Sequence, residues 1–187
     1  MRKNKFKKIT ALLLTLILVL SSVPISVSAA TVQLTGNDTD GYSVNMPVTG
    51  TDTLDLSDRS LGFTFKVYDD GGSGANYSNN CEGYLQITAP TNCLIQLSGS
   101  GNSESTTFDW LIIYDGSDNT ALKLGGDQNG KYAGRPFTVS PLLSSGNVIT
   151  LWFRSDSSDT YSGFELDVTL IDLSKYASVE YFYAGST

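Results

Sequence analysis

Apolar and polar residues alternate with a period of two along several short segments of the chain. In the run 61–67, Leu, Phe, Phe and Val occupy alternate positions, and the run 164–171 repeats this pattern with Phe, Leu, Val and Leu. A period of two is typical of a strand with one buried face. These two runs therefore predict half-buried β-strands.

Three further segments predict strands of a different kind. Residues 148–153 are apolar on both faces, which is typical of a central strand. The dense apolar run 110–114 ends at Asp115-Gly116, a strong turn signal. Apolar residues at 84–87 and 94–97 flank the turn Ala89-Pro-Thr-Asn92, and this arrangement predicts a β-hairpin.

The pattern as a whole predicts an all-β, antiparallel β-sandwich. After the first thirty residues, no window of ten or more residues has helical periodicity, and Gly-rich turns separate the short strands. Residues 31–60 are rich in Thr, Asp and Gly, so we expect an irregular lead-in with one or two weak edge strands. Residues 172–187 form either a C-terminal tail or the start of a further segment.

Residues 1–30 have the order of a secretory signal peptide. A cationic head precedes the apolar run 11–20, and small residues close the segment at Ala29 and Ala30. The alternative is a membrane anchor, but the run is shorter than the roughly 20 residues that a spanning helix needs. Ser21, Ser22 and Pro24 also interrupt it. We expect a secreted or cell-surface protein with no membrane insertion after cleavage.

Cleavage makes the chain strongly acidic. Five of the 12 Lys and Arg residues lie in the signal segment and none of the 19 Asp and Glu residues do, so the mature net charge is 7 minus 19, or −12. Such a chain repels nucleic acid and anionic membranes. Metal cations and basic partner surfaces suit it better, although a simple solvated surface would have the same composition.

Cysteine and histidine content narrows the possible chemistry. The chain has no histidine, which excludes Ser-His and Cys-His catalysis and His-ligated zinc. Cys81 and Cys93 are the two cysteines. Export permits a disulfide between them, but their spacing does not require one.

Three segments together resemble a CUB domain. They are Tyr77–Pro90, with Cys81 ahead of an alternating strand; Phe108–Gly116, with Phe-Asp-Trp-Leu-Ile-Ile-Tyr-Asp-Gly; and Phe153–Phe164, with Phe-Arg-Ser-Asp and a later Gly-Phe. The resemblance covers residues 61–171 and implies a CUB-like jelly roll. The stretch Tyr68-Asp-Asp-Gly-Gly72 is similar to bacterial members. The family's disulfide scheme does not carry over, because Thr106 and Thr107 stand where a cysteine is usual.

The resemblance also implies a Ca²⁺ site formed by Glu104, Asp109 and Asp156. Loop carboxylates suit Ca²⁺, which takes six to eight oxygen ligands in flexible geometry. Asp159 is a further candidate through its carboxylate or its carbonyl. Glu104 lies closer to Asp109 than is usual in calcium-binding members. The alternative is three solvated acids that hydrogen-bond their own turns.

These features predict a non-catalytic binding module. In the family the calcium-ordered edge often receives a basic side chain from an extracellular protein partner, and Trp110 and Tyr161 could add stacking area or pack within the domain. A carbohydrate-binding module with a glycan partner, and a passive spacer in a larger surface protein, are the alternatives. The one local carboxylate pair for an enzyme would be Glu104 and Asp109. The sequence leaves open the partner, the oligomeric state and any further domains.

Overall fold

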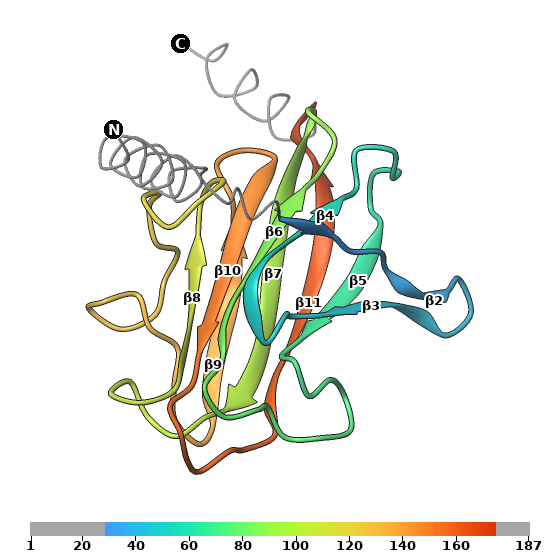
Figure 1. The fold of residues 1–187 in the computed structure, drawn as a ribbon. Helices are drawn as coiled ribbons and strands as arrows, with labels where there is room; N and C mark the ends of the chain where they lie inside the picture. The colour runs from blue at the N-terminus through green and yellow to red at the C-terminus, as the bar shows by residue number, and fades with distance from the viewer. Residues whose placement is uncertain (1–28, 175–187) are drawn as a thin grey trace, which may run out of the picture.

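Two β-sheets packed face to face form the fold of residues 29–174, which are the residues that the computed structural model describes (Figure 1). Sheet A contains, in spatial order, β1 (Ala30–Thr31), β4 (Thr49–Asp55), β6 (Glu82–Thr88), β10 (Val148–Arg154) and β8 (Trp110–Tyr114). Sheet B contains β2 (Thr35–Asn37), β3 (Gly41–Asn45), β5 (Thr64–Tyr68), β11 (Gly163–Asp172), β7 (Cys93–Asn102) and β9 (Phe137–Leu143). The predicted all-β sandwich is confirmed.

The hydrophobic core lies between the two sheets. Leu85 of β6 and Leu151 of β10 point inward from sheet A, and Ile95, Leu166 and Val168 point inward from sheet B; all five are 0% exposed. Residues two apart on these strands share a face, as the alternating pattern predicted. β10 is a central strand, between β6 and β8, as its apolar composition predicted.

The sheets are mixed, because three parallel strand pairs join the antiparallel pairs that the sequence predicted. β4 pairs with β6, β3 with β5 and β1 with β4 in parallel registers. The chain crosses from β3 in sheet B to β4 in sheet A, and each strand lies beside a later strand that runs in the same direction. Side chains alternate identically in parallel and antiparallel strands, so periodicity could not distinguish the two.

Residues 31–60 are more ordered than their composition predicted. β3 and β4 are hydrogen-bonded members of the two sheets rather than a loose lead-in, and Val44, Leu54 and Leu56 are buried in the core. The inward-facing residues Tyr42 and Val44 on β3 and Leu54 on β4 are enough to give each strand a place in its sheet. The threonines of β4 point to the half-exposed outer side, where β-branched residues suit an extended backbone.

The predicted hairpin between residues 84–87 and 94–97 does not form. β6 belongs to sheet A and β7 to sheet B, so the turn at residues 89–92 carries the chain from one sheet to the other. The two strands face each other across the core. Inward-facing apolar residues on opposite sheets produce the same pattern as two paired strands, which explains the error.

The two cysteines are unpaired and buried. Cys81 lies just before β6, and Cys93 begins β7 after the turn that follows β6. The length of β6, about 3.3 Å for each of its seven residues, therefore separates them. A disulfide between Cys81 and Cys93, which the sequence permitted but did not require, is therefore absent.

Much of the predicted signal peptide and of the tail at 172–187 lies outside the described residues. Between residues 29 and 174, no helix has the length and apolar character needed to cross a bilayer.

A buried carboxylate joins β5 to β11. Asp69 is 0% exposed and accepts hydrogen bonds from the backbone N–H groups of Phe164 (2.7 Å) and Gly71 (2.9 Å). Gly163 has a φ of +69°, and a Cβ atom there would overlap the Asp69 carboxylate. Burial raises the pKa of Asp69 to about 6, although the two N–H groups oppose this rise.

Truncation of the core should destabilise the fold strongly. We expect Leu85→Ala, at a site that is 0% exposed, to lower the free energy of unfolding by about 2–5 kcal/mol because it leaves a cavity. Leu122→Ala, at a site that is 73% exposed, should change it by less than about 0.5 kcal/mol. Denaturant unfolding measures both, and equal effects would contradict this packing.

Asp69 should make stability fall as the pH rises from about 4 to 6. Its raised native pKa means that the folded state binds more protons than the unfolded state in this window. The stability of the wild type relative to Asp69→Asn, which does not titrate, should decrease by up to about 3 kcal/mol across the window. Denaturant unfolding at several pH values measures this, and a constant difference would contradict the assignment.

Candidate metal centre

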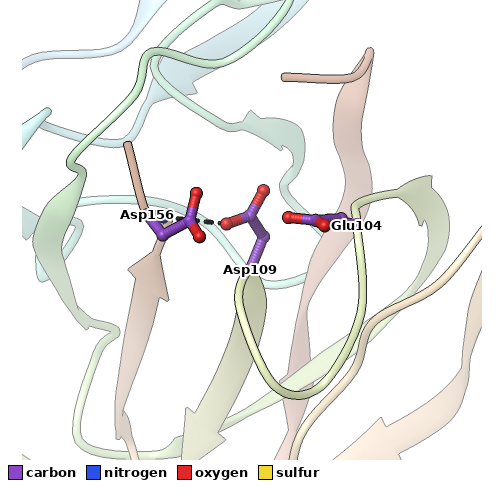
Figure 2. A group of neighbouring side chains, drawn as sticks. All are labelled: Glu104, Asp109 and Asp156. Atoms are coloured by element: carbon purple, nitrogen blue, oxygen red, sulfur yellow. Dashed lines mark hydrogen bonds between the residues drawn. The ribbon is translucent and has the colours of Figure 1, made fainter. Parts of the chain in front are cut away.

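Three carboxylates from two chain segments meet at one end of the sandwich (Figure 2). Glu104 lies in the loop between β7 and β8, Asp109 immediately precedes β8, and Asp156 lies two residues beyond β10. One oxygen of each carboxylate lies within 4.8 Å of the others. We call these three residues the acidic cluster. The structure thus brings together all three residues that the sequence suggested as ligands.

The pairing of β8 with β10 explains why two of these acids are neighbours. The strands are antiparallel, with Trp110 opposite Arg154. The residue before β8 and the residues after β10 must therefore lie at the same end of sheet A. A backbone hydrogen bond fixes the approach, because the N–H of Asp156 donates to Oδ1 of Asp109 at 2.9 Å.

Asp109 is the most enclosed member of the cluster, with an exposed fraction of 0%. Its Oδ2 accepts a 2.6 Å hydrogen bond from the hydroxyl of Tyr77, which is itself buried. Its backbone carbonyl accepts a hydrogen bond from Oγ of Ser103 at 3.0 Å. These bonds hold the carboxylate in one orientation. Burial, and next the hydrogen bond to Asp109, raise the pKa of Tyr77 well above its ordinary value.

Asp156 is anchored through its backbone. Its carbonyl accepts the N–H of Asn80 at 2.5 Å, and its Oδ1 accepts the N–H of Ser158 at 2.9 Å. The preceding residue, Ser155, is also held, because its hydroxyl accepts the N–H of Cys81 and donates to the carbonyl of Ser78. The segment from 78 to 81 therefore supports the segment that carries Asp156.

Glu104 has an unsatisfied carboxylate oxygen. Its Oε2 is buried and has no hydrogen-bond partner among the residues of the described chain. The pKa of Glu104 is raised, first by burial and then by the negative charges of Asp109, Asp156 and Asp159, and Arg135 opposes this rise. A buried acceptor without a donor is costly unless something else binds it.

No salt bridge between described residues neutralises the acidic cluster. Arg135 is the basic residue that lowers the pKa of Glu104, but its guanidinium donates to the hydroxyl of Tyr161 at 2.6 Å and lies 4.3 Å from that ring's centre. The cluster therefore concentrates negative charge at one rim. Arrangements of this kind favour a bound cation, because a cation removes the repulsion between neighbouring carboxylates.

Asp159 also lies next to the acidic cluster. It has a φ of +56°, and its backbone carbonyl lies 3.4 Å from the Tyr77 hydroxyl that holds Asp109. Its charge contributes to the raised pKa of Glu104, and its carbonyl approaches the hydroxyl that holds Asp109, in keeping with its inclusion as a further candidate.

Tyr77 is a neighbour of the acidic cluster to which sequence reasoning assigned no role. It lies in the first CUB-like segment, and its contact with Asp109 joins residues 32 positions apart. No local spacing rule reports a contact of that range. The only available signal was an aromatic residue with a hydroxyl next to a recognised motif.

The two aromatic residues suggested as stacking surfaces are already in contact within the domain. Trp110 is 6% exposed and lies under Lys131, whose Nζ is 4.5 Å from the ring centre. Tyr161 stacks with Arg135. Phe108, beside Asp109, is the exposed aromatic residue of this rim, with an exposed fraction of 43%. Asp115 links its turn to the loop between β9 and β10, because its Oδ1 accepts the N–H of Ser145.

Comparisons with known proteins place this geometry in context. No family model matches the chain. Cubilin of Sus scrofa is 36% identical over 111 residues, which are 56% of this chain and 3% of cubilin. The cubilin homolog of Drosophila melanogaster is 33% identical over 98 residues, which are 50% of this chain and 2% of that protein. The chain thus spans a few per cent of the length of these relatives.

A solved structure has the same fold. The CUB1-EGF-CUB2 domain of human MASP-1/3 superposes with a TM-score of 0.50 at 15% sequence identity, over 72% of this chain and 46% of that one. At this identity the likeness shows the fold alone. The cubilin similarity and the shared fold together support a domain of the CUB type.

Proposed function

We propose that the chain is a secreted or cell-surface, non-catalytic binding module of the CUB type that recognises an extracellular protein in a Ca²⁺-dependent manner. The observation that carries this proposal is the acidic cluster, in which three carboxylates converge within 4.8 Å and Glu104 keeps a buried oxygen without a donor. The signal-like order of residues 1–30 supports export.

The donor set favours Ca²⁺ over other metals. The cluster offers carboxylate oxygens, and the chain has no histidine to favour zinc. Ca²⁺ accepts six to eight oxygens in flexible geometry, whereas Mg²⁺ demands a near-ideal octahedron. Glu104, Asp109 and Asp156 would supply the side-chain ligands, and the carbonyl of Asp159 would be a further oxygen beside them. Such an ion would order the loops at this rim.

A basic side chain of a protein partner suits the same rim. Acidic ligands retain lone pairs after binding a cation, and these can accept hydrogen bonds from a Lys or Arg head group. The exposed ring of Phe108 lies beside the cluster and offers apolar contact area. The strongly acidic balance of the chain would attract a basic partner over a longer range.

The burial of Asp109 argues against glycoside hydrolysis by the Glu104–Asp109 pair. A catalytic carboxylate must reach the scissile bond. Asp109 is instead 0% exposed, and both of its carboxylate oxygens are hydrogen-bonded, to Tyr77 and to the backbone of Asp156. A passive spacer is the competing function, and it predicts no specific effect of calcium.

Calcium should stabilise the domain. A ligand that binds only the folded state adds about 2.7 kcal/mol of stability at a hundredfold excess over its dissociation constant. Thermal melts of the mature domain with calcium and with chelator measure this shift. We expect a clear rise in Tm that is absent with magnesium at the same concentration.

Substitutions should locate that effect. Glu104→Gln and Asp156→Asn keep side-chain size and should each remove much of the calcium-dependent rise in Tm. Asp58→Asn alters an acid whose side chain is 83% exposed and should leave the rise intact. If no rise occurs at millimolar calcium, or if Asp58→Asn abolishes it equally, the calcium site is wrong.

Tyr77→Phe should weaken calcium binding without removing a ligand. The variant loses the 2.6 Å hydrogen bond that orients Asp109, and loss of such outer partners typically lowers metal affinity by about 10–100-fold. Isothermal titration with calcium measures the change. Unaltered affinity in a folded variant would show that Tyr77 does not orient a ligand.

A further inference from the structure

The outer face of sheet A carries a group of aromatic rings that the acidic cluster does not use. Trp152 of β10 lies at its centre. The Tyr84 ring stacks on it at 5.2 Å between centroids and 12° between planes, and the Tyr114 ring lies at 6.4 Å and 19°. Trp110 meets Trp152 edge to face at 4.4 Å. These residues alternate with the core residues of the same strands, so they point away from the core.

The chain after β8 covers two of these rings and leaves the other two partly accessible. Trp110 and Tyr114 are 6% and 2% exposed, whereas Tyr84 and Trp152 are half-buried. The turn at residues 117–119 extends across the sheet as far as β6, where Nε2 of Gln86 donates to the carbonyl of Ser117 at 2.6 Å. This contact places the turn beside Tyr84.

A hollow of about 310 Å³ lies between this turn and the sheet. Its lining residues are Thr51, Tyr84, Ser117, Asp118, Asn119 and Thr150. The volume is at the lower end of the range for small-ligand pockets. One aromatic ring and five polar residues therefore surround a space suited to a small polar molecule.

The lining chemistry matches a sugar ring. The face of an aromatic ring carries partial negative charge and attracts the partly positive C–H groups on the apolar face of a pyranose. Hydroxyl, carboxylate and amide groups supply both donors and acceptors for adjacent sugar hydroxyls. The lining contains no Lys or Arg, and Asp118 would repel sulfate or uronic acid groups. A neutral sugar therefore fits better than an anionic one.

Tyr84 is held in place before any ligand arrives. Its ring stacks on Trp152, and the Trp152 indole Nε1 donates to Oε1 of Glu82 at 2.9 Å. The Tyr84 hydroxyl lies 3.5 Å from the same Glu82 oxygen. A fixed aromatic ring loses little conformational entropy on binding, which favours affinity in a shallow site.

We propose that this hollow, with Tyr84 as its stacking surface, binds a neutral sugar ring of a polysaccharide or of a glycoprotein glycan. The inference is independent of the proposed calcium function. The turn at 117–119 follows the far end of β8 from Asp109, and no residue of the acidic cluster lines the hollow. Sugar binding here requires no metal.

A glycan array that carries both neutral polysaccharides and glycans released from glycoproteins tests the proposal and separates the two sources. The mature domain is probed in the presence of chelator. Oligosaccharides of the best-bound type are then titrated while the fluorescence of Trp152 and Trp110 is followed. We expect Tyr84→Ala to weaken binding at least tenfold and Tyr84→Phe, which keeps the ring, to retain most of it.

Two further variants make the test specific. Asn119→Ala removes an exposed amide of the hollow and should weaken binding several-fold without affecting the core. Tyr68→Ala, a matched change of a half-buried tyrosine on the outer face of sheet B, should leave binding unaltered. Thermal melts establish whether each variant folds. If Tyr84→Ala does not fold, the affinity of Asn119→Ala for the sugar tests the proposal.

Three outcomes would overturn the proposal. The first is an array on which no neutral glycan binds. The second is sugar binding that both Tyr84→Ala and Asn119→Ala leave unaltered. The third is binding that disappears with chelator or in Glu104→Gln, which would place the sugar at the acidic cluster instead.

Discussion

The antiparallel register between β8 and β10 is the constraint on which both candidate sites depend. Trp110 lies opposite Arg154, so the chain that enters β8 and the chain that leaves β10 meet at one end of sheet A. The same register aligns Trp152 with Ile112, and the pairing of β10 with β6 aligns Trp152 with Tyr84 on its other side. A shift of one residue would turn the aromatic rings into the core and separate Asp109 from Asp156.

Asp109 holds together the chain segments that this register brings to one end of sheet A. A carboxylate without exposure is stable only when hydrogen bonds replace its lost water, and Tyr77 and the N–H of Asp156 provide them. The same acid therefore connects three distant chain segments. Glu104 differs, because its buried oxygen has no such partner in the described chain. The acidic cluster therefore combines Asp109, whose two carboxylate oxygens are both hydrogen-bonded, with Glu104, whose buried oxygen has no donor among the described residues.

The sequence predicted where the strands lie, and that Asp109 and Asp156 lie at strand ends, better than it predicted how the strands are connected. Asp109 and Asp156 flank apolar runs whose ends are plain in the pattern, so their positions at strand ends followed directly. The crossing from β6 to β7 was interpreted as a hairpin, because Leu85 and Ile95, buried in one core from opposite sheets, belong to alternating patterns that paired strands would also have. Tyr77 was not assigned a role because its contact depends on tertiary folding.

The position of β11 sets the order in which the sandwich can be completed. β11 is the last described strand, yet it lies inside sheet B, between β5 and β7. Lys66 of β5 forms ion pairs with Glu165 and Asp167 of β11, across separations of 99 and 101 residues. Pairings at such distances close slowly. Sheet B therefore cannot close progressively during synthesis, because the place between β5 and β7 stays empty until residues 163–172 have left the ribosome.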